Sequence, residues 1–151
     1  MDKQIEIMRQ PRLKIISALE AFSLDQLNTN PAGFNNNIIW NLGHMVAAQQ
    51  GVCYKRAGLD TWVADSFFQK YKPDTKPEGY VDAAGFDEIK TLLQTSLDQL
   101  EHDYKNGIFT NYPTWTTRYG VEISSIDDAI AFLPFHEGLH IGYIMAMRKL
   151  V

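Results

Sequence analysis

Two of the four histidines in this 151-residue chain are spaced so that they can share a ligand. His136 and His140 are four residues apart, so on a helix their imidazoles lie on one face and can bind the same metal ion. Imidazole pairs of this kind suit zinc, nickel, iron or copper. The alternative is two core or surface histidines at a chance spacing. The surrounding segment is apolar almost throughout, and an imidazole without a polar partner is costly to bury, so we favour a metal site.

A third ligand is expected from a neighbouring helix, because two imidazoles rarely make a tight metal site. His44 lies near the middle of another apolar segment, although a single histidine there would more often be a hydrogen-bonded core residue. His102 lies between two acidic residues at the polar end of a segment, and we interpret it as a surface residue. The predicted metal ligands are therefore His44, His136 and His140.

Residues 136–140, His-Glu-Gly-Leu-His, also match the H-E-x-x-H pattern of zinc proteases. Those proteases take a third ligand downstream of the pattern. Residues 141–151 contain no His, Asp or Glu, so a protease is not expected. Glu137 is a weak candidate for a general base that hydrogen-bonds a metal-bound water. The other interpretation, to which we give equal weight, is that Glu137 forms an ion pair or a hydrogen bond elsewhere in the protein.

Three imidazoles leave a tetrahedral metal ion with one open position. A metal ion held in this way lowers the pKa of a bound water, or binds and activates a thiolate. Cys53 is not needed as a ligand, because a free buried cysteine most often behaves as a small apolar residue. Arg56 and Arg118 could bind a carboxylate of a substrate. Arg118 is the better placed of the two, although we prefer to interpret it as a solvated surface residue.

Four helices would position these residues, according to the spacing of the apolar side chains. They are expected over about Lys3 to Phe22, Asn37 to Ala57, Phe86 to Tyr104, and Ser124 or Ser125 to Lys149. Pro11 predicts a kink or a break in the first helix, and Pro134 a bend in the last, just before His136. No convincing run of alternating strand residues is present. We therefore expect an all-α protein, a four-helix bundle.

Two long links, Gly58 to Gly85 and Ile108 to Ser124, join the second helix to the third and the third to the fourth. Both carry aromatic residues, which we expect to pack on the bundle and to roof a pocket. A link as long as the first can cross a bundle from end to end, so the second and third helices need not be antiparallel neighbours. Residues 23–26 match a capping box, and Asn37 can cap the second helix.

The composition indicates one globular domain, residues 1–151, with 45% hydrophobic and 21% charged residues. Fourteen Lys and Arg against eighteen Asp and Glu give a net charge of −4, which argues against nucleic-acid binding. No basic cluster marks a membrane surface as a partner. The apolar segment 129–147 includes two histidines and a proline, which favours a buried helix over a membrane span. With a single cysteine and a polar start, a cytoplasmic location is expected.

Three stretches of the sequence resemble the DinB/YfiT-like superfamily. They are residues 40–44 (WNLGH), 119–124 (YGVEIS) and 135–142 (FHEGLHIG), and the resemblance covers nearly the whole chain. It implies a four-helix bundle of up-down-down-up connectivity, frequent homodimers, and a divalent metal, zinc or nickel, held by His44, His136 and His140. The family is distinct from the DNA polymerase that shares the name. Its characterised members include metal-dependent transferases and isomerases that use low-molecular-weight thiols.

The function that we expect is that of a metal-dependent enzyme which activates a low-molecular-weight thiol for attack on a small electrophile. It would be of the S-transferase or isomerase type. A metal-dependent hydrolase that uses water as its nucleophile is one alternative. A bundle that binds a metal or a small molecule without turnover is the other. The expected partners are a small-molecule substrate and a second copy of the chain, without nucleic acid or membrane.

Overall fold

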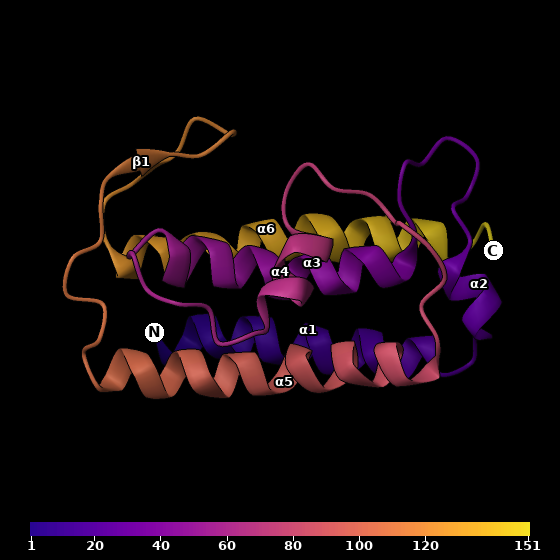
Figure 1. Cartoon of the computed structure of the whole chain (residues 1–151), viewed down its shortest axis with the longest axis horizontal. Helices are drawn as coiled ribbons and strands as arrows, with labels where there is room; N and C mark the ends of the chain where they lie inside the picture. The colour runs from indigo at the N-terminus through magenta and orange to yellow at the C-terminus, as the bar shows by residue number, and fades with distance from the viewer.

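Long helices form the body of the protein, in a computed structural model that describes the whole chain, residues 1–151 (Figure 1). The elements are α1 (Asp2–Leu19), α2 (Leu24–Asn28), α3 (Ile38–Gln50), the π-helical turn η1 (Gly51–Lys55), α4 (Asp65–Tyr71), α5 (Ala83–Lys105), β1 (Trp115–Thr116), β2 (Glu122–Ile123) and α6 (Ile126–Met147). The prediction of an all-α protein is confirmed, apart from one very small antiparallel sheet. No helix combines the length and the apolar character that crossing a membrane requires.

The four longest helices are α1, α3, α5 and α6, and each of them packs against two of the others. Both α1 and α3 contact α5 and α6. In Figure 1, α1 and α6 run from left to right, whereas α3 and α5 run from right to left. The link between α3 and α5 therefore runs from one end of the molecule to the other, as a link of this length can.

Hydrogen-bonding caps fix where several helices begin. Ser23 and Gln26 form the predicted capping box, each bonding to the other's backbone N–H. The Asn37 side chain accepts from the Trp40 N–H at 2.8 Å, which confirms it as the cap of α3. The Ser125 hydroxyl accepts from the Asp128 N–H and caps α6. Such caps satisfy backbone N–H groups that have no partner inside the helix.

Neither proline interrupts its helix. Helix α1 continues through Pro11 and α6 through Pro134, so the possible break at Pro11 is absent. Pro11 lacks the N–H that would bond to the carbonyl of Ile7. Ile7 is exposed, so water can reach this carbonyl. Met8 and Ile15 lie on another side of the helix and are buried in the core.

The two links contain structure that the sequence analysis missed. Helix α4 lies in the first link and buries Phe67, Phe68 and Tyr71 in packing against α3. The second link forms the β1–β2 hairpin, in which Trp115 pairs with Ile123. These short elements place the aromatic residues of the links on the body of the protein, although Trp62 and Tyr80 remain exposed, contrary to expectation.

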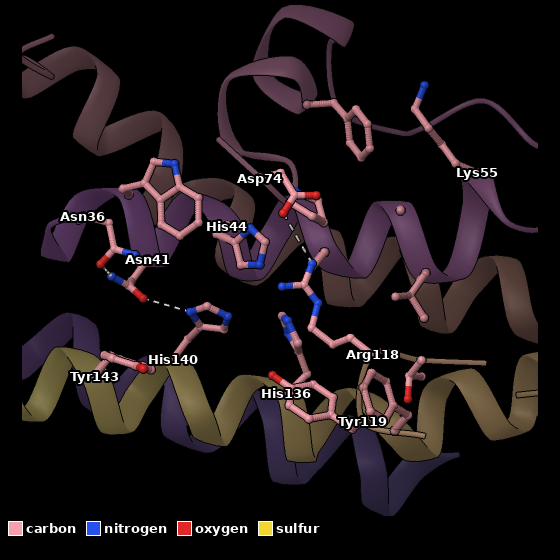
Figure 2. Close-up of a pocket in the computed structure, with 18 of the residues that line it drawn as sticks. Asn36, Asn41, His44, Lys55, Asp74, Arg118, Tyr119, His136, His140 and Tyr143 are labelled. Carbon is pink, nitrogen blue, oxygen red and sulfur yellow. Dashed lines mark hydrogen bonds and ion pairs between the residues drawn. The ribbon is translucent and has the colours of Figure 1, made fainter. Parts of the chain in front are cut away.

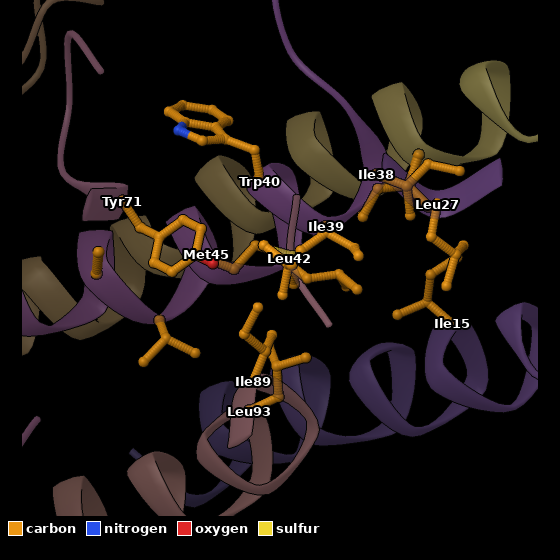
Figure 3. Close-up of a cluster of buried hydrophobic side chains, with 14 of the residues drawn as sticks. Ile15, Leu27, Ile38, Ile39, Trp40, Leu42, Met45, Tyr71, Ile89 and Leu93 are labelled. Carbon is orange, nitrogen blue, oxygen red and sulfur yellow. The ribbon is translucent and has the colours of Figure 1, made fainter. Parts of the chain in front are cut away.

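Helix α3 is the centre of the hydrophobic core, and all of its residues are buried. The larger apolar cluster surrounds it with residues of α1, α2, α4, α5 and α6 (Figure 3). This burial accounts for the apolar sequence around His44. A helix packed in this way holds its side chains in fixed positions, which matters for His44.

A buried arginine joins the four longest helices. Arg12 is fully buried. Its five N–H groups match five acceptors: both carboxylate oxygens of Glu137, the Leu93 carbonyl, the Ser96 hydroxyl and the Gln49 side-chain oxygen. A buried charge is tolerated only when it is paired and hydrogen-bonded in this way.

Candidate metal centre

The three predicted ligands meet between α3 and α6. His44 extends from α3, and His136 and His140 extend from successive turns of α6 toward it (Figure 2). The ring centroids of His44 and His140 are 4.6 Å apart, those of His136 and His140 4.7 Å, and those of His44 and His136 5.4 Å. Each ring offers one nitrogen, and the three nitrogens lie within 4.8 Å of one another.

Hydrogen bonds orient two of the three rings. The Nδ1 of His44 lies 2.7 Å from the Tyr71 carbonyl, which can only accept, so this nitrogen carries the proton. The Nδ1 of His140 lies 2.8 Å from the Asn41 Oδ1. Because the Asn41 amide nitrogen donates to the Asn37 carbonyl, the Oδ1 is left to accept from His140. Both bonds leave Nε2 as the nitrogen with a free lone pair, which is the arrangement found for most metal-bound histidines.

The third ring has no such bond. The Nδ1 of His136 is buried without a hydrogen-bond partner. Buried polar atoms are nearly always paired, and an unpaired one marks a place where an ion, a water or a ligand is expected. An ion, a water or a ligand bound to this nitrogen would satisfy it.

Burial keeps all three imidazoles uncharged at neutral pH. Desolvation lowers the pKa of His136 to about 4, with smaller contributions from the charges of His44 and Arg118. Desolvation also lowers the pKa of His140 to about 3, helped by the neighbouring His44 and His136. The pKa of His44 is lowered for the same reason, although its bond to the Tyr71 carbonyl opposes the shift. Neutral imidazole is the form that binds metals.

These donors fit a divalent transition metal. Three neutral nitrogens suit zinc or nickel, whereas calcium and magnesium prefer oxygen ligands. Two nitrogens bound to tetrahedral zinc are about 3.3 Å apart when each bond is about 2.05 Å. The three nitrogens of the cluster lie within 4.8 Å of one another, which is close to that spacing.

The cluster lies in the wall of a pocket of about 930 Å³. Aromatic residues of both links line it, Phe68 from α4 and Trp115 and Tyr119 from the hairpin, as expected. Arg118 also lines it, and in Figure 2 its guanidinium points toward the imidazoles. The preferred interpretation of Arg118 as a plain surface residue was therefore incomplete. Its side chain is 65% exposed, but it faces the pocket and pairs with Asp74 at 3.7 Å.

Glu137 faces away from this cluster. Both of its carboxylate oxygens bond to Arg12, at 3.0 and 2.5 Å, and its side chain is buried. It is adjacent to His136 in the sequence, and neighbouring residues of a helix point about 100° apart. The structure thus agrees with the second interpretation of Glu137, and we correct the first by assigning it no role as a general base.

The remaining candidates lie where the sequence predicted. His102 is exposed on α5 and bonds only to Asn106. Cys53 is fully buried, and desolvation raises the pKa of its thiol, which therefore stays protonated. Sequence reasoning missed Asn41 and the Tyr71 carbonyl. Asn41 could have been found, because it is a polar residue in an apolar helix, three positions before His44 and so on the same face.

The fold and the site define a class: a helical protein with a group of three histidines that could hold a divalent metal ion. The sequence matches the DinB superfamily over residues 8–144, a range that includes all three histidines, and the protein belongs to this superfamily. No curated protein matches the chain.

Proposed function

We propose that this protein is a divalent-metal-dependent enzyme that activates a low-molecular-weight thiol for reaction with a small electrophile, as an S-transferase or an isomerase. The observation that carries the proposal is the convergence of three imidazole nitrogens within 4.8 Å in the wall of a large pocket. A divalent ion bound to three neutral nitrogens supplies an open coordination position and a positive charge that favours a thiolate. Membership of the DinB superfamily supports the same proposal.

Residues around the imidazoles orient these rings in the metal-free protein. The Tyr71 carbonyl and the Asn41 amide fix the protons of His44 and His140 on Nδ1. Trp40 stacks on His44 at a centroid distance of 4.7 Å and limits the movement of that ring. Such support reduces the entropy that is lost when ligands gather around an ion.

The carboxylates in and near the pocket are already paired with arginines, which favours a thiol over water as the nucleophile. A water nucleophile benefits from a carboxylate base, and Glu137 is held by Arg12. Asp74 is the only acidic residue that lines the pocket, and it pairs with Arg118. A thiol has an ordinary pKa of about 8.5 and needs little help to ionise. These observations support the transferase or isomerase over the hydrolase.

Three further features belong to this proposal. The directions of α1, α3, α5 and α6 in Figure 1 support the up-down-down-up four-helix bundle that the resemblance implies. We also propose a homodimer, on the basis of family membership, and a cytoplasmic location, because thiols are kept reduced there.

Metal analysis of purified variants tests the site. We expect about one zinc or nickel ion per chain in the wild type, and a loss of most of it in His44→Ala, His136→Ala and His140→Ala. His102→Ala is the matched control, because this histidine is exposed and outside the cluster. Unchanged metal content in all three variants would contradict the proposal.

An activity assay then separates the functions. The metal-loaded protein is incubated with an electrophilic test substrate and several cellular thiols. Conjugation that requires both the metal and a thiol supports the proposed activity. Turnover that is unaffected by thiols would instead indicate the hydrolase, and no turnover with any substrate a binding protein.

A further inference from the structure

The pocket is positively charged although the protein is acidic. The chain has a net charge of −4, yet Lys55, Arg56 and Arg118 line the pocket and Asp74 is its only carboxylate. The three imidazoles are neutral, and a divalent ion bound to them would add further positive charge. A concave site that collects one sign of charge attracts ligands of the opposite sign.

Arg118 is the cation closest to the imidazoles. It lies on the turn between β1 and β2, and its charge contributes to lowering the pKa of all three histidines. Its partner Asp74 is 3.7 Å away and 89% exposed, and an ion pair this open to solvent is weak. The Asp74 carboxylate thus occupies the position that an oxyanion of a bound ligand would take.

Arg56 and Lys55 place two more cations farther along the same pocket. The π-helical turn makes Arg56 bond to the Gly51 carbonyl five residues back, so both residues lie on the pocket side. The Arg56 guanidinium stacks on Trp115 at 4.2 Å and has no carboxylate partner. Lys55 lies 4.7 Å from the Phe68 ring centre and pairs with the exposed Asp65 at 3.7 Å.

The length of the helix separates these cations from the imidazoles. Lys55 follows His44 by eleven residues. At 1.5 Å per residue, this corresponds to roughly 16 Å along the axis. A ligand that reaches from the imidazoles to Arg56 and Lys55 is therefore elongated.

We propose that the substrate is an elongated organic anion. Its reacting end lies at the three imidazoles, and its oxyanion groups, carboxylate or phosphate, are bound by Arg118 and by the Arg56–Lys55 pair. The position of the reacting end rests on the proposed function, whereas the recognition of the oxyanion rests only on the charges that line the pocket. The planar guanidinium of arginine suits either oxyanion, because both can accept two parallel hydrogen bonds.

The first experiment uses the metal-free protein, so that it does not depend on the metal. Succinate, inorganic phosphate and the neutral analogue succinamide are titrated at constant ionic strength, with calorimetric detection. We expect saturable binding of at least one oxyanion and none of succinamide, and the succinate and phosphate arms distinguish the two kinds of ligand. Equal binding of succinate and succinamide, or no binding of either oxyanion, would overturn the proposal.

Variants assign the binding to the named residues. Arg118→Gln and Arg56→Gln should each weaken oxyanion binding by about tenfold to a hundredfold, the range of a charged hydrogen bond. Asp74→Asn should strengthen it, because the competing carboxylate is removed. Asn suits this position, where the backbone φ is 65°. Arg148→Gln and Lys14→Gln, outside the pocket, are the matched controls and should have no effect.

The second experiment uses the cobalt-loaded protein and follows thiolate-to-cobalt absorption. Mercaptosuccinate should bind at least about tenfold more tightly than 2-mercaptoethanol, and Arg118→Gln should abolish most of this preference. Equal affinities in the wild type would contradict the proposal. Failure of cobalt to bind would contradict the proposed function instead, and the metal-free titrations would still decide on the oxyanion site.

Discussion

The orientation of His140 depends on a single amide oxygen. Asn41 donates with its nitrogen to the Asn37 carbonyl and the Asn36 side chain, and accepts from His140 with its oxygen. The amide cannot turn over without losing these bonds. A side chain that never contacts the metal can thus decide whether the ring presents its free lone pair to the cluster.

Asn41→Leu should therefore weaken metal binding by about tenfold to a hundredfold, because His140 loses the acceptor that fixes its proton on Nδ1. Competition with a chromophoric chelator measures the affinity. Asn41→Asp keeps an acceptor for His140 but loses the bonds that the Asn41 nitrogen donates to Asn37 and Asn36, so it should bind metal more tightly than the Leu variant. Equal affinities of the Leu and Asp variants would show that this hydrogen bond does not matter.

The pair of Arg12 and Glu137 offers a second test at the level of residues. Both side chains are buried, and removing either one alone would leave the charge of the other without a partner. Arg12→Met should lower the free energy of unfolding by about 3–5 kcal/mol, whereas Arg12→Met combined with Glu137→Leu should recover most of the loss. Urea unfolding measures these two variants and Glu137→Leu alone. A double variant as unstable as the sum of the two single changes would show that the ion pair itself is not the cause.

At the level of elements, α4 connects the core to the site. It packs on α3, and its last residue, Tyr71, supplies the carbonyl that orients His44. The contact is very close at Gly43, where a Cβ atom would lie 2.5 Å from the Tyr71 ring. Glycine at this position allows the two helices to approach, so the packing of α4 and the geometry of the ligand are linked.

Gly43→Ala should disturb both the packing of α4 and the position of His44. The added methyl group must displace the Tyr71 ring, which we expect to lower the stability by about 1–3 kcal/mol and to weaken metal binding through His44. Thermal unfolding and the chelator competition measure the two effects. Gln94→Ala in α5 is the control, because Gln94 is exposed on a helix and alanine favours helix. Similar behaviour of the two variants would contradict the link.

The ligand set and the long helices could be predicted from the sequence because both follow from periodicity. His136 and His140 lie one turn apart whatever the rest of the fold, and the apolar segment around His44 indicates that this helix is buried. Local signals also identified the caps at Ser23 and Asn37, and placed the start of the last helix at Ser124 or Ser125, since a cap bonds within three residues.

The missed features depend on contacts between distant segments. The partner of Glu137 is Arg12, 125 residues away in the sequence, and no local pattern links the two residues. Helix α4 has seven residues, too few to show a clear period, and it is held by its packing on α3. The orientation of Arg118 likewise follows from a hairpin with two residues in each strand.

At the level of the whole molecule, α6 combines the candidate site with an exposed surface. One side carries the candidate ligands, whereas another side is apolar and faces solvent. The exposed residues on this side follow one another at steps of three and four: Ala131, Phe135, Gly138, Gly142 and Met145. An exposed apolar stripe on a protein of ordinary composition is often an interface. Small residues within such a stripe allow a second helix to come close.

We expect the chain to form a dimer in which this stripe of α6 packs against its copy around a two-fold axis. Sedimentation velocity should give a mass near twice 17.2 kDa for the wild type. Met145→Lys should shift the population to the monomer without loss of helical content, because it places a charge within the apolar stripe. Ile108→Lys, an equally drastic change at an exposed apolar residue outside α6, should remain a dimer. A wild-type protein that sediments as a monomer at all concentrations would exclude the dimer, and dissociation by both variants would exclude α6 as its interface.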